Sequence, residues 1–105
     1  MNSRREMVIQ MLKDTPDDAF LIYALALEEH KDGDLSAAIK RLHALMESQP
    51  EYIGTYYQLG KFYEEELDIP KAIATYKAGI EKAIRQKASK MERELKEALF
   101  LIDED

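Results

Sequence analysis

Apolar residues recur at intervals of three and four along six stretches of the chain, and short polar turns separate these stretches. This spacing places the apolar side chains on one face of a helix, and no stretch shows the strict alternation of a half-buried strand. The pattern therefore predicts an all-α protein. Helices are expected over residues 2–14, 16–31, 35–48, 50–66, 69–86 and 90–102.

Proline, glycine and capping residues mark the expected helix boundaries. Thr15-Pro16-Asp17 and Gln49-Pro50-Glu51 each place a proline where the first turn of a helix tolerates its missing N–H, with Thr15 as the predicted N-cap. Gly33 suits a left-handed helix ending and Asp34 suits the cap of the next helix. Leu67-Asp68-Ile69-Pro70 repeats this turn without the glycine.

The boundary before the last helix is the least defined. Ser89 and Glu92 have the spacing of a capping box, which predicts a helix start at this point. No proline or glycine separates the fifth and sixth helices near Lys87, so the pattern leaves open whether they are separate or continuous.

The sequence repeats itself with a period of 34 residues up to about Arg85. A fixed period of this length is typical of repeat proteins, in which each repeat is one helix pair that buries its apolar face against its neighbours. The matched pairs are Tyr23 and Tyr57, Leu25 and Leu59, Ala26 and Gly60, Asp34 and Asp68, Ala38 and Ala72, and Ile39 and Ile73.

The second repeat reads Tyr56-x2-Leu59-Gly60-x2-Tyr63 and then Ala72-x3-Tyr76, and the first reads Ile22-x2-Leu25-Ala26-x2-Glu29, then Ala38-x3-Leu42 and Pro50. With this spacing the sequence resembles the tetratricopeptide-repeat (TPR) family, particularly its short stand-alone bacterial members. The resemblance implies a right-handed TPR-type helical solenoid that forms a single domain over residues 1–105. Two full helix-turn-helix repeats, at 16–50 and 51–86, would be flanked by an N-terminal capping helix (1–15) and a C-terminal capping helix (87–105).

The same motifs predict the core. Small residues let the two helices of a repeat approach closely, and larger ones fill the space beside them. Glu29 departs from the family pattern, which has an aromatic core residue there. Its stem could cover apolar surface while the carboxylate reaches water, or the helix could be slightly rotated. The residues expected to be buried are Leu25, Ala26, Ala38, Ile39, Leu42, Leu45, Tyr56, Leu59, Gly60, Tyr63, Ala72, Ile73, Tyr76 and Ile80.

Charge and composition narrow the class of partner. The net charge of −6 and the pI near 5.0 oppose binding to nucleic acid. The longest uninterrupted apolar run, Ala19 to Leu27, is too short to cross a membrane, and the N-terminus does not read as a signal peptide. We therefore expect a soluble, cytoplasmic protein that binds neither nucleic acid nor membranes.

Candidate chemistry is sparse. The chain has no cysteine, and His30 and His43 lie on different predicted helices without a paired ligand motif. Consecutive helical residues point in different directions, so the carboxylates of 64–66 cannot converge on one ion, and those of 103–105 read as a solvated chain end. No Gly-rich phosphate loop or nucleophile motif is present. We expect no metal, no cofactor and no catalytic centre, and therefore no enzyme.

The TPR resemblance implies a binding site for a peptide or protein segment in a concave groove lined by the first helix of each repeat. Its residues would be Phe20, Tyr23 and Leu27 in the first repeat, with Tyr57, Lys61 and Glu64 in the second. The alternative is that the first three simply pack against a neighbouring helix. The family's carboxylate clamp for chaperone C-termini is missing, because Tyr23, Leu27 and Gln58 stand at its positions.

A structural role is the rival function. Leu99-Phe100-Leu101-Ile102 surrounds its helix with apolar side chains, and one packed face cannot bury all four. The chain could therefore form a homodimer or larger homo-oligomer through the groove or through this C-terminal apolar helix. The sequence does not identify the partner or the pathway.

Overall fold

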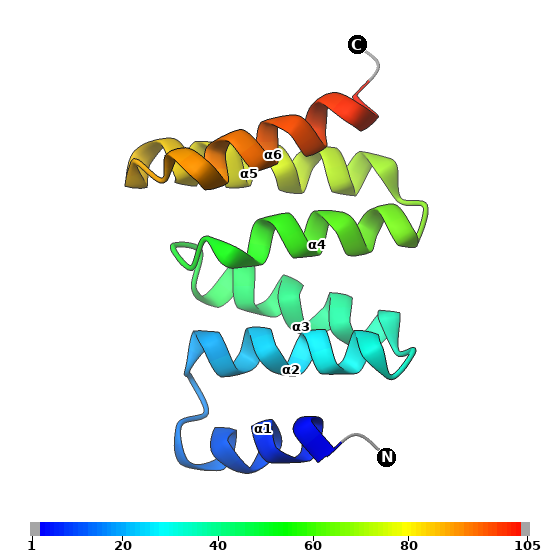
Figure 1. The fold of residues 1–105 in the computed structure, drawn as a ribbon, viewed down its shortest axis with the longest axis vertical. Coiled ribbons are helices and arrows are strands. Elements are labelled where there is room, and N and C mark those ends of the chain that lie inside the picture. The colour runs from blue at the N-terminus through cyan, green and yellow to red at the C-terminus, as the bar shows by residue number, and fades with distance from the viewer. Residues whose placement is uncertain (1–2, 104–105) are drawn as a thin grey trace. The chain divides into compact units, whose positions relative to one another are not determined.

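The computed structural model describes residues 3–103, which contain six α-helices and no strand (Figure 1). The all-α prediction is confirmed, and the fifth and sixth helices are separate. The helices are α1 (Ser3–Asp14), α2 (Ala19–Lys31), α3 (Leu35–Ser48), α4 (Gly54–Glu65), α5 (Ile69–Gln86) and α6 (Ser89–Ile102).

The chain divides into two compact units, Met1–Tyr52 and Ile53–Asp105. In the first unit α2 packs against both α1 and α3, and in the second unit α5 packs against both α4 and α6. Each unit therefore contains one antiparallel helix pair and one further helix.

Three helices end in the same way, with one residue in the left-handed conformation. Gly33 has φ +84°, Leu67 has φ 65° and Lys87 has φ 57°. The amide of the following residue then donates to the carbonyl five residues earlier, as in Asp34 N–H to Glu29 O at 2.9 Å. The left-handed ending at Gly33 is confirmed, and the same ending at Lys87 separates α5 from α6.

Aspartates cap the N-termini of three helices. Asp34 accepts a hydrogen bond from the Ala37 amide at 3.1 Å, as predicted, and Asp68 accepts one from Lys71 at 3.2 Å. α2 is capped by Asp18, whose carboxylate accepts from the Leu21 amide at 3.1 Å. The first turn of each of these helices thus gains both a hydrogen bond for a backbone amide and a favourable charge from one side chain.

The predicted starts of α2 and α4 were wrong by about one turn. Thr15 is not a cap: its hydroxyl donates to the Met11 carbonyl at 3.3 Å, at the end of α1. Pro16 follows it in a turn, and α2 begins only at Ala19. α4 likewise begins at Gly54 rather than at residue 50, after Ile53 and without a side-chain cap. Pro16 and Pro50 therefore lie in the turns before α2 and α4 and not inside these helices.

The capping-box prediction was also wrong, although α6 does begin at Ser89. The N-cap of α6 is Ala88, which leaves the first turn without a side-chain cap. Ser89 is therefore already helical. Glu92 is used elsewhere, since its carboxylate accepts a hydrogen bond from Lys96 at 2.7 Å.

Most of the predicted core is buried, including Leu42, Leu59, Ala72 and Tyr76 at 0% exposure. Ile73 and Ile80 are exceptions and are only half-buried. The buried stripe of α5 runs through other positions, so these two isoleucines lie at its edge. That stripe is formed by Ala72, Thr75, Tyr76, Gly79 and Ala83.

Two glycines allow helices to cross closely in the second unit. A Cβ atom at Gly60 would overlap the ring of Tyr76, which confirms the predicted close approach of α4 and α5. A Cβ atom at Gly79 would lie 2.5 Å from Cβ of Tyr56 and 3.0 Å from Cδ1 of Leu95. Gly79 was not recognised from the sequence, because its role depends on side chains from α4 and α6.

Candidate peptide-binding surfaces on α2 and α4

The first candidate surface lies on α2, where Phe20, Tyr23 and Leu27 follow a spacing of three and four and so share one helix face. Phe20 is 63% exposed, while Tyr23 and Leu27 are half-buried. The Tyr23 ring lies 6.0 Å from the ring of Tyr52 at an interplanar angle of 58°. This tilted arrangement is favourable for an aromatic pair.

Burial and the neighbouring phenol raise the pKa of Tyr23, and burial followed by the Asp18 carboxylate raises the pKa of Tyr52. Both phenols therefore stay protonated at neutral pH and can donate hydrogen bonds. Tyr52 was missed from the sequence. The predicted helix over residues 50–66 placed it inside a helix, whereas it lies in the turn between α3 and α4.

The second candidate surface lies on α4, where Tyr57, Lys61 and Glu64 also share one helix face and interact directly. The Lys61 ammonium lies 5.5 Å from the centroid of the Tyr57 ring, a cation–π distance, and 3.9 Å from the Glu64 carboxylate. The three side chains are half-buried. This surface is therefore a connected patch of mixed charge around an aromatic ring.

Tyr76 of α5 contacts this patch on α4. It was predicted as a core residue, and its ring is buried, but its hydroxyl donates a hydrogen bond to the Glu64 carboxylate. The Tyr76 ring centroid lies 6.4 Å from that of Tyr57. Burial, and then the Glu64 carboxylate, raise the pKa of Tyr76. The core residue thus holds the surface carboxylate in place.

The structure shows how the Glu29 side chain is accommodated at a position where the family has an aromatic residue. Its side chain is 3% exposed, so the carboxylate does not reach water. Instead Arg41 of α3 binds it through two hydrogen bonds, 2.8 Å from Nε and 2.9 Å from Nη2, and Arg5 of α1 lies 3.8 Å away. The hydrogen bonds to Glu29 raise the pKa of Arg41. A buried ion pair therefore replaces the aromatic residue and connects three helices.

The other hollows and polar clusters offer few groups that could bind a metal or react with a substrate. A hollow of about 360 Å³ in the first unit is lined by Leu12, Ile22 and Leu45 among others, and it contains no predicted site residue. His43 contacts Glu47 at 3.3 Å within α3. Over residues 3–103, no group of three His, Cys, Asp or Glu side chains could hold a metal ion. In the same part of the chain, no helix is long and apolar enough to cross a membrane.

Comparison with known proteins decides the family. No family model matches the sequence, and no curated protein matches it either. A tetratricopeptide repeat domain protein from Salinibacter ruber is similar in its solution NMR structure, with 41% identity over 84% of this chain and 89% of that chain and a TM-score of 0.81. The chain belongs to the TPR family.

A crystal structure of a Salinibacter ruber TPR domain protein agrees, with 41% identity over 82% of this chain and 96% of that chain and a TM-score of 0.78. A solution structure of a protein from Bordetella parapertussis shares the fold at 22% identity, over 97% of this chain and 89% of that chain, with a TM-score of 0.82. The TPR-type helical fold predicted from the 34-residue period is thus confirmed. TPR domains are in general protein-interaction modules.

Proposed function

We propose that this TPR protein is a non-enzymatic module that binds a peptide or protein segment in a groove lined by the first helices of its repeats. The observation that carries the proposal is the pair Tyr23 and Tyr57. These residues lie 34 positions apart, and both rings are only partly buried. Partly exposed tyrosines at equivalent positions suit a repeated contact with one extended ligand, because tyrosine offers large contact area at low entropic cost.

The side chains around each tyrosine suggest what the ligand contains. Phe20 and Leu27 accompany Tyr23, so α2 suits apolar or aromatic anchors. Lys61 and Glu64 accompany Tyr57, so α4 suits a segment with both charges. The proposed ligand is therefore a short segment with apolar residues toward one end and mixed charge toward the other. A cytoplasmic location and the absence of catalytic, metal and cofactor chemistry are parts of this proposal.

A peptide selection with matched variants tests the proposal. Peptides would be selected from a random display library on the wild-type protein and titrated calorimetrically against Tyr23→Ala and Tyr57→Ala. Each substitution is expected to cost about 1–3 kcal/mol of binding free energy, because it removes an aromatic anchor. Phe100→Ala, which removes an exposed ring from α6, serves as the control and should bind like the wild type.

The folded state of each variant would be checked by circular dichroism, so that lost binding is not confused with unfolding. Selected peptides that bind the wild type and the Tyr23→Ala/Tyr57→Ala double variant equally would contradict the proposal. Ligand-induced NMR shifts confined to residues outside α2 and α4 would do so as well.

A further inference from the structure

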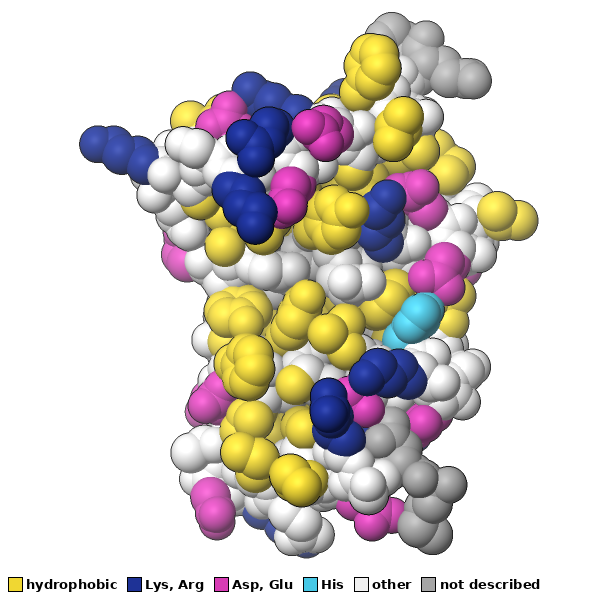
Figure 2. Space-filling view, in the orientation of Figure 1, with side chains coloured by type: hydrophobic (Ala, Val, Ile, Leu, Met, Phe, Trp, Pro, Cys, Tyr) yellow, Lys and Arg dark blue, Asp and Glu magenta, His cyan; other side chains and the backbone are white. Residues whose placement is uncertain are grey.

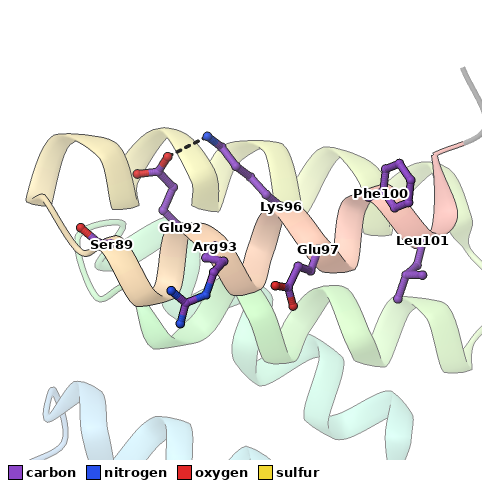
Figure 3. Close-up of a pocket in the computed structure, with 7 residues that line it drawn as sticks. All are labelled: Ser89, Glu92, Arg93, Lys96, Glu97, Phe100 and Leu101. Atoms are coloured by element: carbon purple, nitrogen blue, oxygen red, sulfur yellow. Dashed lines mark hydrogen bonds and ion pairs between the residues drawn. The ribbon is translucent and has the colours of Figure 1, made fainter.

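The outward face of α6 carries large apolar side chains that are exposed. Leu95 and Ala98, on the inner face of α6, are buried within the second unit. On the other side Phe100 is 82% exposed and Leu101 is 77% exposed. Figure 3 shows both side chains projecting from the last turns of the helix, beyond the charged residues of the same surface. This surface belongs to neither candidate peptide-binding surface.

Charges on the same face balance locally. Glu92 and Lys96 already pair with each other at 2.7 Å (Figure 3). The side chains of Arg93 and Glu97 make no ion pair or hydrogen bond within residues 3–103, although they lie one helical turn apart. Two basic and two acidic side chains therefore line this surface, in a protein whose net charge is −6. Figure 2 likewise shows basic and acidic side chains interspersed over the part of the molecule formed by α5 and α6.

The spacing on this face is self-complementary. Lys90, Arg93, Glu97 and Phe100 are separated by three, four and three residues, so they form one stripe along α6. Two such helices can lie antiparallel about a two-fold axis level with residue 95. Arg93 of each copy then faces Glu97 of the other, and Lys90 faces Phe100. Each symmetric pair of helices gains two opposite-charge contacts and two contacts between a lysine and an aromatic ring.

We infer that the outward face of α6 is a self-association surface, on which a second copy of the chain docks antiparallel through Arg93–Glu97 and Lys90–Phe100 contacts. A second copy fits better than a foreign partner because the stripe supplies its own complement under two-fold symmetry. The local charge balance also lowers the repulsion between two acidic molecules at this face. One helix face is small compared with the interfaces of stable dimers, so the dimer is weak. This inference does not rest on the groove proposal.

Charge-reversal variants test the docking directly by sedimentation equilibrium, from about 10 µM to about 1 mM protein, a range that covers weak association. The wild type is expected to dimerise at the upper concentrations. Arg93→Glu alone and Glu97→Arg alone each place like charges opposite one another, so each is expected to weaken dimerisation about tenfold or more. Mixing these two variants restores both opposite-charge contacts, so the mixture is expected to form a heterodimer.

Two further variants separate this surface from others. Phe100→Ser is expected to weaken the dimer, whereas Ile84→Ser, which removes an apolar side chain from α5 that is 53% exposed, should not. Tyr23→Ala should leave the dimer unchanged, so failure of the groove proposal and failure of this one are distinguishable. A wild type that stays monomeric throughout the range would overturn the inference. So would a dimer whose dissociation constant is the same in Arg93→Glu and in the wild type.

Discussion

At the scale of single residues, equivalent positions of the two repeats adopt the same backbone conformation with different residues. Gly33 and Leu67 are 34 positions apart, and both hold the left-handed conformation that ends the first helix of a repeat. Glycine adopts this conformation freely, whereas an L-residue pays a steric cost of about 1 kcal/mol or more. Leu67 gains no burial in return, because its side chain is 84% exposed.

Leu67→Gly is therefore expected to stabilise the protein by roughly 0.5–1 kcal/mol, since it relieves the strained backbone without losing packing. Thermal and urea unfolding followed by circular dichroism would measure the change. The reciprocal variant Gly33→Leu should destabilise the protein. A Leu67→Gly protein that is less stable than the wild type would show that the leucine side chain makes a stabilising contact.

Glu29 is the second residue whose role depends on its partners. Its carboxylate is buried and bound by the Arg41 guanidinium, in the position that Tyr63 fills in the second repeat. Removing one partner of a buried ion pair leaves the other uncompensated, and typically costs about 3–5 kcal/mol. The side chain of Arg41 is 38% exposed, so water offsets part of that cost.

We expect Glu29→Ala to destabilise the protein by about 2–4 kcal/mol, and Glu29→Ala/Arg41→Ala to cost less than the sum of the single variants. Urea denaturation of the wild type, both single variants and the double variant gives the coupling energy. Strict additivity of the two substitutions would mean that the two hydrogen bonds contribute nothing to stability.

At the scale of helices, the crossings in the second unit are set by tyrosine–glycine pairs. Gly60 makes room for the Tyr76 ring, and Gly79 makes room for Tyr56 and Leu95. The equivalent residues of the first repeat are Ala26 with Leu42 and Leu45 with Ile22, which are closer to each other in size. The core of the second unit therefore contains large rings, and the glycines opposite them provide the space that these rings occupy.

Gly79→Ala tests this packing, because helix propensity and packing predict opposite signs. Alanine favours a helix by about 1 kcal/mol over glycine, but a Cβ atom here would overlap Tyr56. We expect net destabilisation of about 1–3 kcal/mol, measured by thermal unfolding. The control is Ala78→Gly at the neighbouring exposed position, which should also destabilise, by about 1 kcal/mol, through propensity alone. A more stable Gly79→Ala protein would show that α5 can shift away from α4.

At the scale of the whole molecule, buried phenols make stability depend on alkaline pH. Burial is the largest cause that raises the pKa values of Tyr23, Tyr52, Tyr63 and Tyr76 above their ordinary value near 10. The folded state keeps these protons to higher pH than the unfolded state does. Their contribution is fully present below about pH 10 and is lost as the pH rises further.

The free energy of unfolding is therefore expected to fall above about pH 10, by at most about 1.4 kcal/mol per pH unit for each phenol. Tyr76→Phe should make this fall shallower, because one phenol no longer ionises on unfolding. Urea denaturation of both proteins between pH 8 and about pH 11 measures the two slopes. Equal slopes would show that Tyr76 ionises equally easily in the folded and unfolded states.

The sequence by itself determined the fold family, and the reason is repetition. Each repeat must present the same small and large residues to the same neighbours. The 34-residue period was therefore enough to predict that Leu25, Ala38 and Leu59 are buried. The turn at Gly33 and the cap at Asp34 were also predictable, because those backbone requirements are local. For the candidate peptide-binding surfaces, the sequence supplied the residues on α2 and α4 that share a helix face.

Tertiary structure alone decided the features that depend on residues distant in sequence. Arg41 and Arg5 bury the Glu29 charge from two other helices, and Tyr76 reaches Glu64 from the next helix, pairings that no local spacing encodes. Gly79 is needed only because Tyr56 and Leu95 approach it. α2 and α4 begin at Ala19 and Gly54 rather than at the predicted residues 16 and 50. The start of a helix depends on the available capping side chain and on which face packs against other helices, and not on a proline alone. Local rules act within one or two helical turns, whereas burial and ion pairing depend on which helices meet.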